Sequence, residues 1–142
     1  MKSKLIMMAY QDEAWVKPIS TLLCGMGYRV ETSRTVDEII SKVRKEEIRV
    51  VLLDDEMGGI KASNLIPLLK RLNPRVQIIV ISSGQSLGQA KRLREAGIFY
   101  QAMKPVDGEE IRSAVACAFD KIEREQPEGW FLPFLLPGGV AA

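Results

Sequence analysis

Four short apolar runs of this sequence each end in polar residues that could carry out chemistry. These polar groups are Tyr10–Glu13, Asp54–Glu56, Ser82–Ser83 and Lys104. A carboxylate can accept a phosphoryl group, a hydroxyl can donate to a phosphoryl oxygen, and a lysine can neutralise negative charge. Carboxylates also suit Mg²⁺, which prefers oxygen ligands. The set therefore suits phosphoryl chemistry, provided that the fold brings its members together.

The apolar runs alternate with amphipathic stretches, which predicts alternating strands and helices. The run Tyr28–Thr32 alternates like a half-exposed edge strand, whereas Leu5–Ala9, Val50–Leu53, Val76–Ile81 and Phe99–Met103 look central. A strand that is apolar on both faces is buried on both, which indicates a parallel sheet covered by helices. We predict an α/β fold, a (βα)₅ flavodoxin-like three-layer sandwich with parallel strand order 2-1-3-4-5.

This sheet would bring the four polar groups to one edge. In open parallel sheets, ligands bind outside the carboxyl ends of the strands, where the strand order reverses. Taken singly, each group has a structural explanation: an Asp forms turns or helix caps, a Ser caps the next helix, and Lys-Pro forms a turn. Taken together at one edge, they favour a functional site.

Start signals indicate where the helices begin. Pro18 falls where the first helix should already be running, and a proline inside a helix costs about 3 kcal/mol. We therefore expect this helix to begin late, near Trp15–Val16, or to kink. Thr35–Glu38 is a capping box, and Asp107–Glu110 is a second capping-type pair.

Composition restricts the class of protein. With 142 residues, 46% hydrophobic and 27% charged, the chain is long enough for one globular domain, which we place at residues 1–125, followed by a tail at 126–142. The chain has no histidine, which excludes imidazole ligands and histidine-based catalysis. Its two cysteines, Cys24 and Cys117, are too few for a zinc site, and we expect two buried, reduced thiols.

Charge and hydropathy indicate the compartment and the partners. The net charge is +2, from 20 basic and 18 acidic residues, which argues against a nucleic-acid partner. No stretch approaches the roughly 20 apolar residues of a membrane span. The apolar run near the N-terminus is also too short for a signal peptide. We therefore expect a cytoplasmic location.

The loop after the third run carries a resemblance to a known family. Leu52–Gly59, which reads LLDDEMGG, is similar to the LLDxxMPG loop of the receiver domain of bacterial two-component response regulators, a CheY-like domain. The intervals from Asp54 to Ser82 and from Ser82 to Lys104 fit the family pattern without gaps, and the resemblance covers residues 3–123. It implies that Asp54 is the phosphoacceptor, that Ser82 contacts the phosphoryl group, and that Lys104 stabilises the product.

The resemblance also implies a Mg²⁺ site, but with a degenerate acidic pocket. Its ligands would be Asp12, Asp54 and the backbone carbonyl of Glu56, with Gln11 as a further candidate. Tyr10 and Gln11 stand where the family has two adjacent acids, and the acids present lie one or two places later. A neutral ligand in place of an anionic one should weaken Mg²⁺ binding. We expect Tyr10 to occupy the water-filled part of the site.

Further features of the family pattern are altered or retained. Gly58 replaces a proline, which should loosen the loop after the acceptor. Gln101 stands at the aromatic switch position and Tyr100 lies one place early, which puts aromatic-coupled switching in doubt. By the same resemblance, the Lys104–Pro105 peptide bond is expected to be cis.

These observations support two main hypotheses. In the first, the chain is a phosphorelay receiver: a histidine kinase or phosphotransfer protein transfers a phosphoryl group to Asp54, and a downstream protein reads the changed surface. Such a domain is no enzyme beyond transfer and hydrolysis of its own phosphoryl group. In the second, it is a pseudo-receiver, an interaction module that is not efficiently phosphorylated because Tyr10 and Gln11 replace the acidic pair. A flavodoxin-like enzyme or flavin binder is a distant third, because the first loop lacks a phosphate cradle.

The tail differs in composition from the rest of the chain. Trp130–Pro137 is apolar, contains prolines and aromatics, and carries no charge. It could fold back on its own domain, dock on another protein or on a second copy of the chain as a homodimer, or touch a membrane surface. Because the residues after the last helix are too few for an output domain, we expect readout through protein contact.

Overall fold

The computed structural model describes residues 4–45, 47–84 and 86–125, and centres on a five-stranded parallel sheet. The sheet order is β2-β1-β3-β6-β7, which confirms the predicted order 2-1-3-4-5 of the principal strands. The tail from residue 126 lies outside the described residues, so its three alternatives stay predictions. The strands of the sheet are β1 (Leu5–Ala9), β2 (Arg29–Ser33), β3 (Val50–Asp54), β6 (Gln77–Ser82) and β7 (Tyr100–Met103).

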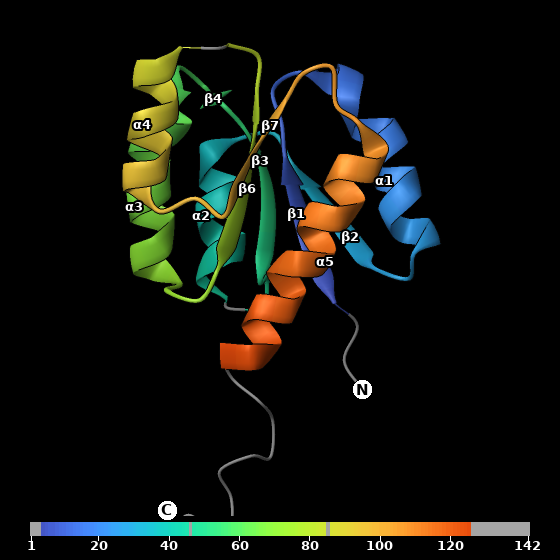
Figure 1. Cartoon of the computed structure of the whole chain (residues 1–142). Helices are drawn as coiled ribbons and strands as arrows, with labels where there is room; N and C mark the ends of the chain where they lie inside the picture. The colour runs from blue at the N-terminus through green and yellow to red at the C-terminus, as the bar shows by residue number, and fades with distance from the viewer. Residues whose placement is uncertain (1–3, 46, 85, 126–142) are drawn as a thin grey trace, which may run out of the picture.

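Helices cover both faces of the sheet, which confirms the three-layer α/β sandwich (Figure 1). The first and last helices pack on one face, and the other three pack on the opposite face. A short 3₁₀ turn, η1 (Glu13–Trp15), precedes the first helix. The α-helices are α1 (Val16–Gly25), α2 (Val36–Arg44), α3 (Ala62–Leu72), α4 (Leu87–Ala96) and α5 (Gly108–Glu125).

The continuous apolar runs are explained by burial on both faces. In β1, Ile6 and Met8 join the core beneath α1 and α5, whereas Met7 and Ala9 join the core beneath α2, α3 and α4. Side chains alternate between the faces of a strand, so each central strand contributes to both cores. Burying an aliphatic side chain of this size contributes about 1.5–3 kcal/mol, so these strands supply much of the stability.

Of the two outer strands of the sheet, only one was predicted to lie at the side of the sheet. β2 lies at an edge, as its alternating sequence predicted. β7 lies at the opposite edge, so the expectation that this run is central was wrong. Within it only Ala102 is fully buried, while Tyr100 is 37% exposed. The polar Gln101 and the phenol of Tyr100 are consistent with an edge position.

The first helix begins late enough to place Pro18 in its first turn. Asp12 caps η1 by accepting a hydrogen bond from Ala14 N at 3.0 Å, and α1 then begins at Val16. This confirms the predicted late start. Pro18 therefore lies in the first turn of α1, where its missing N–H removes no intrahelical hydrogen bond.

The two predicted capping pairs have different outcomes. Thr35 Oγ1 accepts from Glu38 N at 3.2 Å, which confirms the N-cap of α2. Asp107 accepts from Glu109 N at 3.1 Å at the start of α5. Glu110 takes no part in that cap, because its carboxylate accepts the hydroxyl hydrogen of Tyr100 on β7. The hydrogen bond to Glu110 raises the pKa of Tyr100, with smaller contributions of the same sign from burial and charge.

Both cysteines are free and exposed, so the expectation of buried thiols was wrong. α1 buries Ile19 and Leu23, which lie four residues apart on one face. Cys24 follows Leu23 and is rotated by about 100° away from that face. Cys117 likewise precedes the buried Ala118 of α5. Each cysteine has apolar neighbours in the sequence, but the helical period turns those neighbours toward the core and leaves the cysteine exposed.

A small hairpin follows β3, where the sequence predicted only a loop. Its strands are β4 (Glu56–Met57) and β5 (Ile60–Lys61), which pair antiparallel. Gly58 and Gly59 join them with φ of 55° and 81°, a conformation that glycine adopts readily in two-residue turns. Where we expected a looser loop at Gly58, the chain forms a hydrogen-bonded turn. The hairpin and the loop leading into α5 lie at the same end of the sheet, beyond the carboxyl ends of the strands (Figure 1).

Two further expectations concern single features. The Lys104–Pro105 peptide bond is cis, as the resemblance implied. Across residues 4–45, 47–84 and 86–125, no helix has both the length and the apolar character needed to cross a membrane.

Candidate functional site

Asp54 ends β3 and lies at the centre of the candidate site, with only 1% of its surface exposed. Its Oδ2 accepts hydrogen bonds from two backbone amides, Gln11 N at 2.6 Å and Asp12 N at 2.9 Å. Its Oδ1 accepts from the indole Nε1 of Trp15 at 3.1 Å and pairs with Lys104 Nζ at 3.0 Å. Four donors thus meet one buried carboxylate, which satisfies the charge-assisted hydrogen bonding that a buried anion requires.

The parallel register brings these donors to Asp54. Ala9 at the end of β1 lies beside Leu53 of β3, so the chain that leaves β1 crosses the end of β3. The 3₁₀ turn then directs Trp15 back toward the sheet, where the residue is only 5% exposed and packs in the core beneath α1 and α5. A buried indole needs a partner for its N–H, and Asp54 supplies it.

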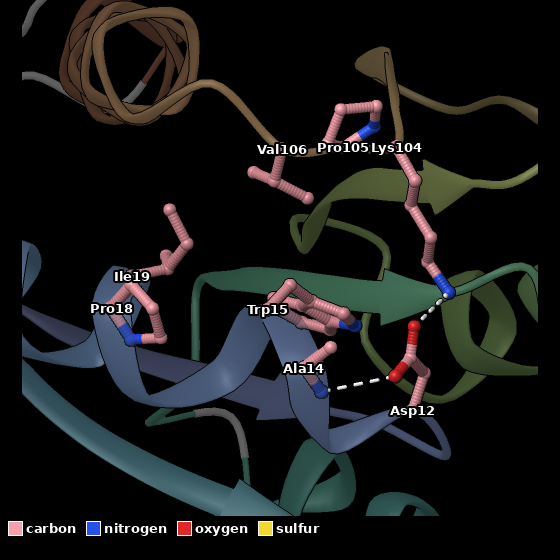
Figure 2. A pocket seen from close by; sticks show the side chains of 8 residues that line it. All are labelled: Asp12, Ala14, Trp15, Pro18, Ile19, Lys104, Pro105 and Val106. Atoms are coloured by element: carbon pink, nitrogen blue, oxygen red, sulfur yellow. Dashed lines mark hydrogen bonds and ion pairs between the residues drawn. The ribbon is translucent and has the colours of Figure 1, made fainter.

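Lys104 links two carboxylates at this edge. Its Nζ lies 3.0 Å from Asp54 Oδ1 and 3.1 Å from Asp12 Oδ2. Burial lowers the pKa of Lys104, but the hydrogen bonds and charges of Asp54 and Asp12 outweigh burial and raise the pKa overall. The pKa of Asp12 is lowered, first by the hydrogen bond from Ala14 N and then by Lys104. Figure 2 shows the ammonium facing the Asp12 carboxylate, with the Trp15 indole nitrogen turned toward the same side.

Ser82 lies at the end of β6, but its hydroxyl is directed to a different acid. The residue is fully buried, and its Oγ lies 3.3 Å from Gly84 O and 3.5 Å from Asp55 Oδ2. The same Asp55 oxygen accepts from Ser83 N at 3.0 Å and from Ser83 Oγ at 3.3 Å. The structure therefore brings Asp54 and Lys104 together and holds the Ser82 hydroxyl against Asp55. No separate role for Asp55 was predicted from the sequence.

Tyr10 does not lie where we expected it. The expectation that it would fill the water-filled part of the site was wrong, because its ring packs with Met8 against the core beneath α1 and α5. Arg34 lies over the other side of the ring, with its guanidinium carbon 5.6 Å from the centroid. Tyr10 N still bonds Ser33 O, so the strand alternation continues through Tyr10 and turns its side chain to the face of Met8.

Trp15 is the aromatic residue that reaches Asp54, whereas its place in the sequence indicated only the start of the first helix. It also forms a wall of a pocket of about 460 Å³ between the start of α1 and the loop after β7 (Figure 2). The pocket is apolar except for the Asp12–Lys104 pair at one end. Its lining residues are Asp12, Ala14, Trp15, Pro18, Ile19, Lys104, Pro105 and Val106.

The predicted Mg²⁺ ligands do not form a metal site in this arrangement. Both oxygens of Asp54 face N–H donors, and Asp12 faces Lys104. The side-chain oxygen Oε1 of Gln11 accepts from Gly58 N at 2.8 Å. Glu56, whose backbone carbonyl was the predicted ligand, lies in β4 opposite Lys61, and its role as a ligand stays a prediction. Within the part of the chain that the structure describes, no group of three acids or cysteines is placed to hold a metal ion. The residues present therefore do not fit Mg²⁺.

The fold, with its site at the carboxyl ends of the strands, is that of a class of signalling domain. The family model for the response regulator receiver domain matches residues 6–116, and the chain belongs to this family. Receiver domains act in two-component systems, where the family interacts with histidine kinases, and they generally bind Mg²⁺ at an acidic pocket.

Curated relatives and solved structures agree with this assignment. The chain is 28% identical over 120 residues to the DNA-binding transcriptional regulator NtrC of Azospirillum brasilense, covering 84% of this chain and 25% of NtrC. It is 22% identical over 125 residues to the transcriptional regulatory protein GlrR of Escherichia coli K12, covering 88% of this chain and 28% of GlrR. The chain thus spans about a quarter of the length of these relatives.

Two of the solved structures that match this chain illustrate the shared fold. A CheY-like receiver domain protein from Methanospirillum hungatei superposes with a TM-score of 0.81 at 24% identity, covering 87% of this chain and 99% of that one. The beryllofluoride-activated NtrC4 receiver domain dimer superposes with a TM-score of 0.78 at 24% identity, covering 84% and 98%.

Proposed function

We propose that this chain is a pseudo-receiver: a protein-interaction module of a two-component system in which Asp54 is not efficiently phosphorylated. The observation that carries this function is the set of four donors around Asp54. Two backbone amides, the Trp15 indole and the Lys104 ammonium all face its two oxygens. A carboxylate held in this way is a poor nucleophile, because attack would have to break charge-assisted hydrogen bonds.

The electrostatics of the site support the same function. Transfer to a carboxylate brings an anionic phosphoryl group toward an anion, and receiver domains in general use Mg²⁺ to offset that repulsion. Here, among the residues that the structure describes, the cation paired with Asp54 is the ammonium of Lys104, which also pairs with Asp12. Partners in the cytoplasm would recognise the folded surface itself. The partner would be a histidine kinase, a downstream protein or a second copy of the chain.

The test is phosphorylation of the purified chain by acetyl phosphate, with and without Mg²⁺, followed by intact mass. We expect no phosphoryl adduct on the wild-type chain. The matched variant is Y10D/Q11D/W15F, which restores the acidic pair and removes the indole donor to Asp54 Oδ1. It should gain a Mg²⁺-dependent adduct that the same variant with D54N loses. An adduct of one phosphoryl group on the wild-type chain, absent from D54N, would contradict the pseudo-receiver function.

Phosphorylation of Asp54 is the second candidate, and one observation favours it. Lys104 Nζ lies 3.0 Å from Asp54 Oδ1, next to an open pocket. In that role, Asp54 would attack the phosphorus of a phosphohistidine, the N–P bond would break as the O–P bond forms, and Lys104 would neutralise charge on the acyl phosphate. Trp15 or the two amides would first have to release the attacking oxygen. The acetyl phosphate experiment separates the two candidates.

A further inference from the structure

The side chain of Gln11 ties the loop after β1 to the hairpin after β3. Its Oε1 accepts from Gly58 N at 2.8 Å, while its own backbone N–H donates to Asp54 Oδ2 at 2.6 Å. One residue thus contacts both the end of β3 and the turn that follows β4. A proline at position 58 would have no N–H to donate, so the glycine found there supplies the donor.

Lys104 makes a second link across the same edge. Its ammonium lies between Asp12 of the β1 loop and Asp54 of β3, at 3.1 and 3.0 Å. The three charges sum to a single negative charge, so the two carboxylates are already partly neutralised. These two carboxylates thus already have a cation between them, and position 11 contributes a neutral side chain whose oxygen is engaged by Gly58 N.

We propose that Gln11 and Lys104 together hold the β1 loop against the end of β3 in the place of a divalent cation. Gln11 acts as a positioning residue: it fixes the β4–β5 turn through Gly58 and touches no reacting group. We call this pair of contacts, Gln11–Gly58 and Lys104 with Asp12 and Asp54, the clamp. The clamp holds the two loops together without a metal ion. This role stands whether or not Asp54 accepts a phosphoryl group.

The first test is amide hydrogen exchange at Gly58, measured by NMR on the whole chain. Removing the acceptor in Q11A should speed exchange of the Gly58 amide roughly three- to tenfold, the range expected for one net hydrogen bond. Q11E keeps an acceptor oxygen and should restore slow exchange. The control is Q89A, a glutamine-to-alanine change in the first turn of α4, where the backbone N–H of Gln89 bonds Ser86 Oγ. Unchanged Gly58 exchange in Q11A would overturn the assignment to Gln11.

The second test is thermal unfolding of the wild-type chain with EDTA or with millimolar MgCl₂ at matched ionic strength. We expect the same Tm in both conditions, since no site depends on the cation. A saturable rise of the wild-type Tm with Mg²⁺ would overturn the clamp. Phosphorylation by acetyl phosphate would contradict the pseudo-receiver function while leaving the Gly58 exchange result standing, so the two failures are distinguishable.

Discussion

Replacing Trp15 by phenylalanine tests the contact that most distinguishes this site. The change keeps an aromatic ring in the core and removes the indole N–H that donates to Asp54 Oδ1 at 3.1 Å. A hydrogen bond to a charged group contributes about 1.5–3 kcal/mol, and three other donors to Asp54 remain, so we expect a loss of about 2 kcal/mol from this bond. For a chain of this size, this corresponds to a fall in Tm of about 6–8 °C.

A double-mutant cycle separates the hydrogen bond from the loss of ring volume. W15F is measured in the wild-type chain and in D54A by urea unfolding followed by far-ultraviolet circular dichroism. In D54A the acceptor is absent, so W15F removes only packing there. We expect W15F to cost about 2 kcal/mol more in the wild-type background. Equal costs in the two backgrounds, within about 0.5 kcal/mol, would refute the Trp15–Asp54 contact.

Two further predictions concern protonation and reactivity. The lowered pKa of Asp12 contributes stability that is present above the ordinary pKa of 3.8 and is lost as the pH falls through the pKa of the folded chain. The raised pKa of Lys104 contributes stability that is present below the ordinary pKa of 10.5 and is lost as the pH rises through the pKa of the folded chain. Unfolding free energies measured against pH should therefore lose part of the acid limb in D12N and part of the alkaline limb in K104Q, and unaltered limbs would contradict the ion pair. Cys24 and Cys117 should both react rapidly with a thiol reagent in the native chain, and slow modification that needs denaturant would contradict their exposure.

The sequence was sufficient to predict the sheet and the position of Asp54 and Lys104, because both depend on strand periodicity. Continuous apolar runs specify burial on two faces, and the ends of such runs specify one edge of a parallel sheet. The direction of Tyr10 could also have been predicted, because alternation from Met8 turns it to the same face. The edge position of β7 follows from the predicted strand order itself.

The contacts of Trp15 and Asp55 could not be predicted in the same way. Trp15 reaches Asp54 because a 3₁₀ turn of three residues redirects the chain before α1, and no period in the sequence marks so short an element. Asp55 turns toward Ser82 and Ser83 through loop geometry beyond the end of β3. The Gly58–Gly59 turn carried a usable signal, since two glycines between short paired segments are typical of a tight hairpin.

The most direct measurement of whether Asp54 is engaged by its own chain is an NMR titration with beryllofluoride and Mg²⁺. The resonances to follow are the Trp15 indole N–H and the backbone amides of Gln11 and Asp12, which all donate to Asp54. We predict that these three resonances stay in place in a large excess of beryllofluoride and shift only when Asp54 is replaced. A saturable, Mg²⁺-dependent shift of all three in the wild-type chain would contradict the account.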